Sequence, residues 1–251
     1  SIFVASGLFL RGKLGRARYL ALIFVLFLPT TINETKITIV YLPLGLLVAF
    51  AAGAEPRRRL RFVAWGLVLT LVFAGLFLPT YSYFEARSPW AKLDSVTALA
   101  SNQKDLSKYL SSDVKGIGTK KNVRRGDAIR VPFDYLARDP IRLTLGLGLG
   151  SVSPSATLGK SFQGPYYALF RPFLITSFTV FLLEIGVLGI ALVVLLNLFV
   201  LRDALALAHQ DQKLISGLAT GWTAVTLIML LSLFYSTIHL AESLAYPYWY
   251  F

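Results

Sequence analysis

The feature that most constrains the fold is Pro172–Leu201, a run of thirty residues in which Glu184 is the only charged side chain. About 20 apolar helical residues cross the ~30 Å hydrocarbon core of a bilayer. Further apolar stretches occur at 19–32, 37–52, 62–80 and 214–238. Only 15% of the chain is charged, against roughly a quarter in a soluble domain. The sequence therefore predicts an all-α, polytopic helical membrane protein with about six spans.

Two short, densely basic loops set the expected orientation. The first contains Arg11, Lys13, Arg16 and Arg18, and the second runs through 55–61. Lys/Arg-rich short loops stay on the cytoplasmic side, whereas long loops escape this rule. The tip at 33–36, between two short spans or within a re-entrant pair, and the polar segment 81–171 then face outward. We expect a single membrane domain over 1–251, cut at both ends, with 81–171 as a large, partly helical periplasmic loop.

Several chemistries are excluded or disfavoured. The chain has no cysteine, so it has no disulfide, thiolate metal site or cysteine nucleophile. His209 and His239 are too far apart in the sequence to suggest a metal cluster. We interpret His209 as a solvated loop residue, and His239 as interfacial packing or, alternatively, a base. We expect no metal, no cofactor and no nucleic-acid partner.

The most polar part of the outer loop is the arginine segment, residues 124–150. It contains five arginines within nineteen residues, Arg124, Arg125, Arg130, Arg138 and Arg142. Arginine suits a diphosphate because its planar fork donates two parallel hydrogen bonds and stays charged. One interpretation is therefore an anion clamp, and the other is an interfacial helix held by ion pairs.

The spacing predicts a helix in this segment. Asp127 can cap it and the pair Asp139-Pro140 ends it, because the residue before proline avoids helical dihedrals. Two faces are expected: Arg130, Asp134 and Arg138 on one, and Ile129, Phe133 and Leu136 on the other. The apolar face would lie on a membrane or on the protein.

Gly146, Gly148 and Gly150 alternate with leucines at the end of the arginine segment. A nucleotide-binding interpretation fails, because no βαβ unit, Walker lysine or following acid accompanies these glycines. They indicate a tight turn, or a close backbone approach to a bound group.

Glu184 lies near the outer membrane boundary. Counting back about 20 residues from Arg202 places that boundary near Leu182, so 172–181 would stand beside the arginine segment. Thr176, Ser177 and Thr179 belong to this protruding part, and Gly186 and Gly189 would permit close helix packing below it. An ionisable group at this depth is a functional candidate, although a structural cap or ion pair explains it equally well.

These motifs together resemble the O-antigen polymerase and O-antigen ligase superfamily. The matching stretches are 125–130, Asp139-Pro140, 146–150 and the span motif 182–189, and the aromatic end 246–251 looks like the start of that family's final span. The resemblance covers roughly residues 19–251. It implies a metal-independent, inverting glycosyl transfer outside a bacterial inner membrane, from a glycan carried on undecaprenyl diphosphate.

The resemblance also implies roles for individual residues. Arg125 and Arg130 would hold the diphosphate. Beyond the resemblance, our own hypothesis is that Glu184 or Asp127 orients or deprotonates the incoming sugar hydroxyl. The expected substrate-binding set is Arg124, Arg138, Arg142, Lys36, Gly146, Gly148 and Gly150. Expected partners are the lipid-linked glycan, membrane lipids and a chain-length regulator.

Three functions remain open at this point. Ligases of the superfamily carry a His-Asn pair shortly before the glutamate, where this chain has Ile175-Thr176. This departure favours a polymerase of O-antigen or exopolysaccharide repeat units over a ligase that transfers glycan to lipid A, and it leaves the base unassigned. A transporter or flippase of lipid-linked glycan is the non-enzymatic alternative, although no inverted repeat is visible.

Overall fold

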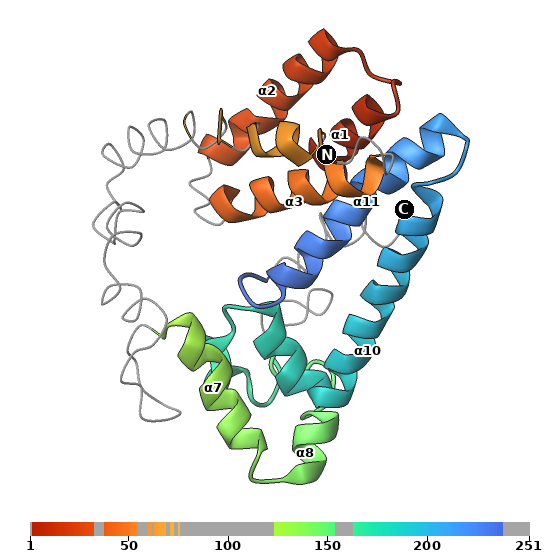
Figure 1. Cartoon of the computed structure of the whole chain (residues 1–251). Coiled ribbons are helices and arrows are strands. Elements are labelled where there is room, and N and C mark those ends of the chain that lie inside the picture. Colours follow the sequence, from red (N-terminus) through yellow and green to blue (C-terminus); the bar gives the residue numbers. More distant parts are fainter. Residues whose placement is uncertain are drawn as a thin grey trace. The chain divides into compact units, whose positions relative to one another are not determined.

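The structure is a computed structural model that describes residues 2–32, 38–54, 60–61, 63–68, 71–72, 75, 123–153 and 163–237. Every regular element within these ranges is a helix, which agrees with the all-α prediction (Figure 1). The elements are α1 (Ile2–Leu10), α2 (Arg16–Ile32), α3 (Thr38–Gly53), α7 (Arg125–Leu136), α8 (Pro140–Leu145), α9 (Tyr167–Phe170), the 3-10 helix η2 (Arg171–Phe173), α10 (Ser177–Leu207) and α11 (Lys213–Ser232). Lys36, His239, all of 81–122 and the end 246–251 lie outside the described residues.

The chain divides into two compact units. The first comprises Ser1–Leu99 and Asn197–Ile228, and the second comprises Ala100–Leu196 and Met229–Phe251. Helices α10 and α11 each contribute residues to both units. The second unit contains the arginine segment and Glu184, so it holds the candidate site.

In the first unit, α1 packs against α11 through glycines. A Cβ atom on Gly7 would overlap the backbone of Gly217, and one on Gly221 would overlap that of Val4. Gly217 and Gly221 are four residues apart and share one face of α11, the small-xxx-small spacing that lets helix backbones approach closely in membranes. This contact was not predicted, although the spacing of the two glycines is visible in the sequence.

Three helix ends lie together in the first unit. Arg11 donates a hydrogen bond to the carbonyl oxygen of Ala208, directly after α10. A Cβ atom on Gly53, at the end of α3, would lie 2.6 Å from Thr220 Cγ2 and 2.9 Å from Leu10 Cδ1. The basic loop after α1, the end of α3 and the α10–α11 turn are therefore neighbours. This arrangement is compatible with the expectation that the two basic loops, after α1 and after α3, face one side of the membrane.

Helices α10 and α11 are each long and apolar enough to cross a bilayer. The most apolar 18-residue window of α10 is only 28% buried, which distinguishes it from the core helix of a soluble protein. The predicted bounds need correction. Helix α10 begins at Ser177 and not at Pro172, which belongs to the preceding helix η2. It continues past Leu201 to Leu207, because no helix breaker follows Leu201. Helix α11 ends at Ser232, where the chain turns at 233–235, so the predicted span 214–238 is too long.

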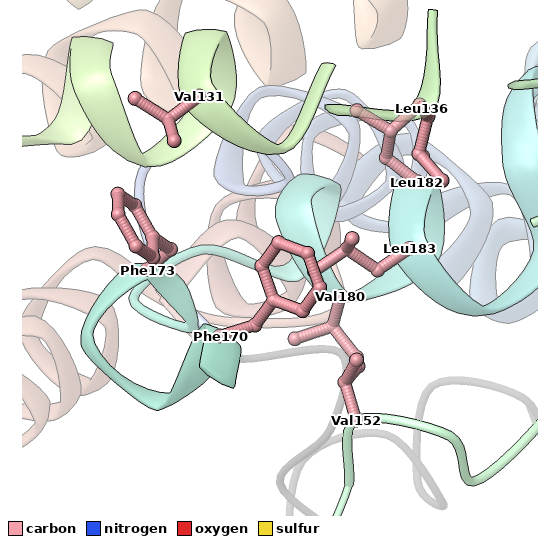
Figure 2. Packing of buried hydrophobic residues seen from close by; sticks show 8 residues of the cluster. All are labelled: Val131, Leu136, Val152, Phe170, Phe173, Val180, Leu182 and Leu183. Carbon is pink, nitrogen blue, oxygen red and sulfur yellow. The ribbon is translucent and has the colours of Figure 1, made fainter. Parts of the chain in front are cut away.

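An apolar core joins the elements of the second unit (Figure 2). It contains Val131 and Leu136 of α7, Val152 of the loop, Phe170 and Phe173 before α10, and Val180, Leu182 and Leu183 of α10. Phe170, Phe173 and Leu183 have no exposed surface. The first turns of α10 are therefore buried by the arginine segment and by the chain that leads into the helix.

Candidate functional site

The arginine segment is fixed to α10 by a hydrogen bond that proline makes possible. Pro132 lies inside α7 and has no N–H group, so the carbonyl oxygen of Ala128 lacks its intrahelical donor. The hydroxyl of Thr179, in the first turn of α10, donates to that oxygen at 3.0 Å. Thr179 and Ala128 both have no exposed surface. The predicted contact between the arginine segment and the start of the Glu184 helix is confirmed.

The buried face of α7 differs from the predicted apolar face. The buried residues are Asp127, Ala128, Val131, Pro132 and Leu136. Phe133, predicted on the apolar face that would lie on a membrane or on the protein, is 42% exposed. The buried face is rotated because α7 turns the free carbonyl of Ala128 toward α10. The predicted ion pair is present, since Arg130 Nε lies 3.8 Å from Asp134 Oδ2, but both side chains are more than half exposed and contribute little to stability.

The bounds of α7 also differ from the prediction. The N-cap position is Arg124 rather than Asp127, and its side chain makes no capping hydrogen bond. Asp127 instead lies in the first turn, 2% exposed, where the positive end of the helix dipole favours a carboxylate. The helix ends at Leu136, so Arg138 lies in the turn beyond it.

The pair Asp139-Pro140 begins a helix as well as following one. Asp139 Oδ1 accepts hydrogen bonds from the amides of Ile141, at 3.0 Å, and Arg142, at 3.4 Å. Pro140 occupies the first helical position, where its missing N–H costs nothing. Arg142 also lies 3.2 Å from Asp139, Nε to Oδ2. Asp139 and Pro140 therefore define α8 and direct the chain into the glycines.

Arg125 is held by two contacts with Tyr235. Its Nε donates to the carbonyl oxygen of Tyr235 at 3.2 Å, and its guanidinium lies 4.0 Å from the centre of the Tyr235 ring. A cation over an aromatic face is stabilised by about 0.5–2 kcal/mol. These contacts fix the plane of the guanidinium group at the start of α7.

The first amides of α10 already have acceptors within the protein. The amides of Ser177 and Phe178 donate to the carbonyl oxygens of Ser236 and Leu233 at 2.8 and 2.9 Å. The amide of Thr179 donates to Thr176 Oγ1 at 3.2 Å, and that of Val180 makes the first intrahelical bond, to the Thr176 carbonyl at 3.3 Å. Three of the N–H groups that a helix start leaves unpaired, those of Ser177, Phe178 and Thr179, are thus satisfied.

Helix α10 is broken at Gly186, which has φ 65° and ψ −169°. The close packing predicted for Gly186 is present, because a Cβ atom there would overlap the backbone of Thr144 in α8, and Gly186 in addition breaks α10. Gly186 lets the chain leave the helical conformation, because φ above zero is readily available only to glycine. The carbonyl oxygens of Leu183 and Glu184, beside the break, accept from the amides of Leu147 and Gly148 at 2.7 and 3.1 Å.

The glycines of the arginine segment serve this break. Gly146, Gly148 and Gly150 have φ of 77°, 99° and 75°, so the predicted tight turn is confirmed. A Cβ atom on Gly146 would lie 2.5 Å from the carbonyl carbon of Glu184. The close backbone approach made by Gly146 is therefore to α10.

Glu184 lies one residue before Ile185, the last helical residue ahead of the break, and is half-buried. Its Oε1 atom is buried and has no hydrogen-bond partner among the described residues. Ser151 Oγ, beyond the glycines, is in the same situation. A buried polar atom without a hydrogen-bond partner requires an explanation, and a catalytic or binding role is one such explanation.

Arg125 and Glu184 lie beside different parts of α10. Arg125 contacts the 233–236 turn that covers the helix start at Ser177. Glu184 lies seven residues further on, which is about 10 Å of helix rise. No ion pair between the two is present in the part of the chain that the structure describes.

His209 is exposed, and its Nδ1 atom forms a hydrogen bond with the Leu205 carbonyl of its own turn, at 2.9 Å.

Comparison with protein-family models, with curated proteins and with solved structures gives no match. The resemblance to the O-antigen polymerase and ligase superfamily therefore rests on the motifs in this chain. Within the described ranges, no three His, Asp or Glu side chains come together in a way that could hold a metal ion.

Proposed function

We propose that this chain belongs to a bacterial inner-membrane polymerase that joins lipid-linked oligosaccharide repeat units in O-antigen or exopolysaccharide synthesis. The observation that carries the proposal is the attachment of the arginine helix α7 to the buried start of α10. The Thr179–Ala128 hydrogen bond and the glycine contact at Gly186 tie arginines and a carboxylate to one rigid frame. A frame that holds donor and acceptor groups in place is what a group transfer needs.

In the proposed reaction, an acceptor sugar hydroxyl attacks the anomeric carbon of the donor glycan. The bond from that carbon to the diphosphate breaks with inversion, and undecaprenyl diphosphate leaves with the electron pair. Arg125 stabilises the charge that develops on the diphosphate, which is typically worth a few kcal/mol for one well-placed donor. Glu184, or alternatively Asp127, accepts the proton of the attacking hydroxyl.

The remaining predicted residues take subordinate roles. Arg130 reaches the diphosphate only after leaving its exposed ion pair with Asp134. Arg124, Arg138 and Arg142 supply positive charge near the substrate. The proposal puts the large loop in the periplasm and about six spans in the membrane. The glycines act indirectly, since they hold α10 at the break beside Glu184.

The residues before α10 favour a polymerase over a ligase. At the position of the ligase His-Asn pair stand Ile175 and Thr176. Thr176 is fully buried, and its hydroxyl caps α10 by accepting from the Thr179 amide. This position therefore serves the fold, and a polymerase needs no histidine there if a carboxylate supplies the base.

The helix break is the one observation that bears on a transporter. Broken membrane helices expose carbonyl groups that bind coupling ions near the bilayer midplane. Here the carbonyls of Leu183 and Glu184 already accept backbone hydrogen bonds from the glycine turn. The break therefore gives a transporter little support.

Reconstitution tests the proposal directly. The purified full-length protein in liposomes receives undecaprenyl-diphosphate-linked repeat units, and product length is measured on gels. Lengthening by the wild-type protein and by Arg202→Ala, but not by Arg125→Ala, is expected; Arg202 is 71% exposed and pairs with the adjacent Asp203. Repeat units that stay unextended with the wild-type protein, or a full ladder from Arg125→Ala, would contradict the proposal. Transfer to added lipid A instead would identify a ligase.

A further inference from the structure

Three large apolar side chains stand exposed on α8 and the glycine turn. Ile141 is 71% exposed, Leu145 is 56% exposed and Leu149 is 83% exposed. Ile141 and Leu145 lie four residues apart on α8, which contains no buried residue, and Leu149 follows in the glycine turn. We call these three residues the α8 apolar face, and none of them belongs to the core of the second unit. Apolar groups gathered in this way on a surface indicate a partner.

The α8 apolar face lies beside the point where the side chains of α10 change from buried to exposed. Before Gly186, Val180, Leu182 and Leu183 are at most 2% exposed. After it, Val187, Leu188, Leu192, Leu195 and Leu196 are 46–58% exposed. The amides of Leu147 and Gly148, between Leu145 and Leu149, bond to α10 directly before this change.

The length of α10 beyond the break matches a bilayer. Residues 187–207 number twenty-one and rise about 31 Å, close to the ~30 Å hydrocarbon core. The exposed leucines of this part are suited to lipid, whereas the part before the break is enclosed by protein. A hydrocarbon layer matched to 187–207 would therefore begin at the level of the Gly186 break.

The charges around the α8 apolar face suit a lipid headgroup. Arg138 and Arg142 flank Ile141 in the sequence, and both are exposed. Arginine at a membrane surface keeps its stem on apolar groups and its guanidinium among phosphates. The α8 apolar face lies at the level where the exposed leucines of α10 begin. A bilayer at that level would cover both sets of side chains, whereas a soluble protein partner would cover the α8 apolar face alone.

We propose that Ile141, Leu145 and Leu149 insert into the interface of the bilayer that α10 crosses, among phospholipid headgroups and the first acyl carbons. The insertion anchors the arginine segment at headgroup height and sets the depth of Glu184 just outside the hydrocarbon. The anchor does not depend on the proposed reaction.

The chain lacks cysteine, so single labels can be introduced without removing any native residue. Ile141→Cys, Leu145→Cys and Leu149→Cys in the full chain each receive a nitroxide, and the protein is reconstituted in phosphatidylglycerol/phosphatidylethanolamine liposomes. Accessibility to oxygen, which concentrates in lipid, is compared with accessibility to a water-soluble nickel chelate. Leu192→Cys serves as the hydrocarbon control and Asp134→Cys as the aqueous control; their native side chains are exposed in the structure.

The oxygen-to-nickel ratio at the three α8 positions should be several-fold above that of Asp134→Cys and below that of Leu192→Cys. A ratio equal to that of Asp134→Cys would place these residues in water and overturn the anchor. Low accessibility to both reagents would mean that protein covers the face, and would also overturn it. Size-exclusion profiles identify any variant that fails to fold, and the other two positions then carry the test.

Discussion

The hydroxyl of Thr179 donates to the carbonyl oxygen of Ala128 at 3.0 Å, an acceptor that Pro132 leaves without an intrahelical donor. One residue inside α7 thus creates an unsatisfied group, and one residue of α10 satisfies it. Proline in a helix interior usually weakens the helix. Here the lost bond is replaced by one that fixes the arginine helix to the helix that carries Glu184.

Removal of the Thr179 hydroxyl should destabilise the protein. Thr179→Val keeps the shape but leaves a buried carbonyl unpaired, which costs about 1–3 kcal/mol. Thr179→Ser, which retains the hydroxyl, is the matched control and should cost less. The free energy of unfolding in mixed detergent micelles measures both.

A double-mutant cycle with Pro132→Ala tests the mechanism itself. Alanine at position 132 supplies the missing N–H, so Thr179→Val should cost about 1 kcal/mol less in that background. Equal costs of Thr179→Val with and without Pro132 would show that the proline does not create the need for the hydroxyl.

Some of this site could be predicted from the sequence and some could not. The apolar run, the early residues Thr176–Thr179 beside the arginine segment and the turn at the glycines follow from local composition and length. The break at Gly186 does not, because it depends on backbone bonds from Leu147 and Gly148, far away in the sequence. A glycine in an apolar run indicates close packing as readily as a break.

The faces of α7 show a second limit. Periodicity grouped Phe133 with Ile129 and Leu136 on one apolar face, yet Leu136 is fully buried and Phe133 is 42% exposed. The orientation of a short amphipathic helix depends on the element that it packs against. Here that element is α10, whose Thr179 hydroxyl bonds to the Ala128 carbonyl oxygen. Pro132 inside a predicted helix was the available signal, since every such proline leaves one carbonyl to be satisfied elsewhere.

The glycine contact at the break predicts an order of damage. Gly146→Ala and Gly186→Ala each place a Cβ atom against backbone, in addition to an unfavourable positive φ. Gly148→Ala, with φ 99° and open space around it, is the matched control for the φ effect alone. The control should cost about 1–2 kcal/mol, and the other two about 1–3 kcal/mol more. Equal unfolding free energies for Gly146→Ala and Gly148→Ala would contradict the close approach.

The α1–α11 contact makes a graded prediction in the first unit. A Cβ atom on Gly221 would overlap the backbone of Val4, whereas one on Gly217 would lie 3.1 Å from the nearest atoms of Leu8. Gly221→Ala should therefore lower the free energy of unfolding more than Gly217→Ala does, by about 1–3 kcal/mol of overpacking. Unfolding of both variants in the same micelles measures the difference, and the reverse order would refute the contact.

The proposed reaction assigns unequal weight to two arginines of α7. Arg125 is held against Tyr235, so its fork is oriented before the diphosphate arrives, whereas Arg130 is 68% exposed and must be ordered on binding. Donors fixed in advance stabilise developing charge most effectively, and loss of one such donor typically slows a reaction about 10²–10³-fold. Arg125→Ala should reach this range in the initial rate of repeat-unit extension, and Arg130→Ala should lose about tenfold or less. Arg125→Lys keeps the charge but not the fork, so a rate between those of wild type and Arg125→Ala is expected. Matching unfolding free energies for these variants would separate catalysis from folding, and a larger loss with Arg130→Ala would reverse the assignment.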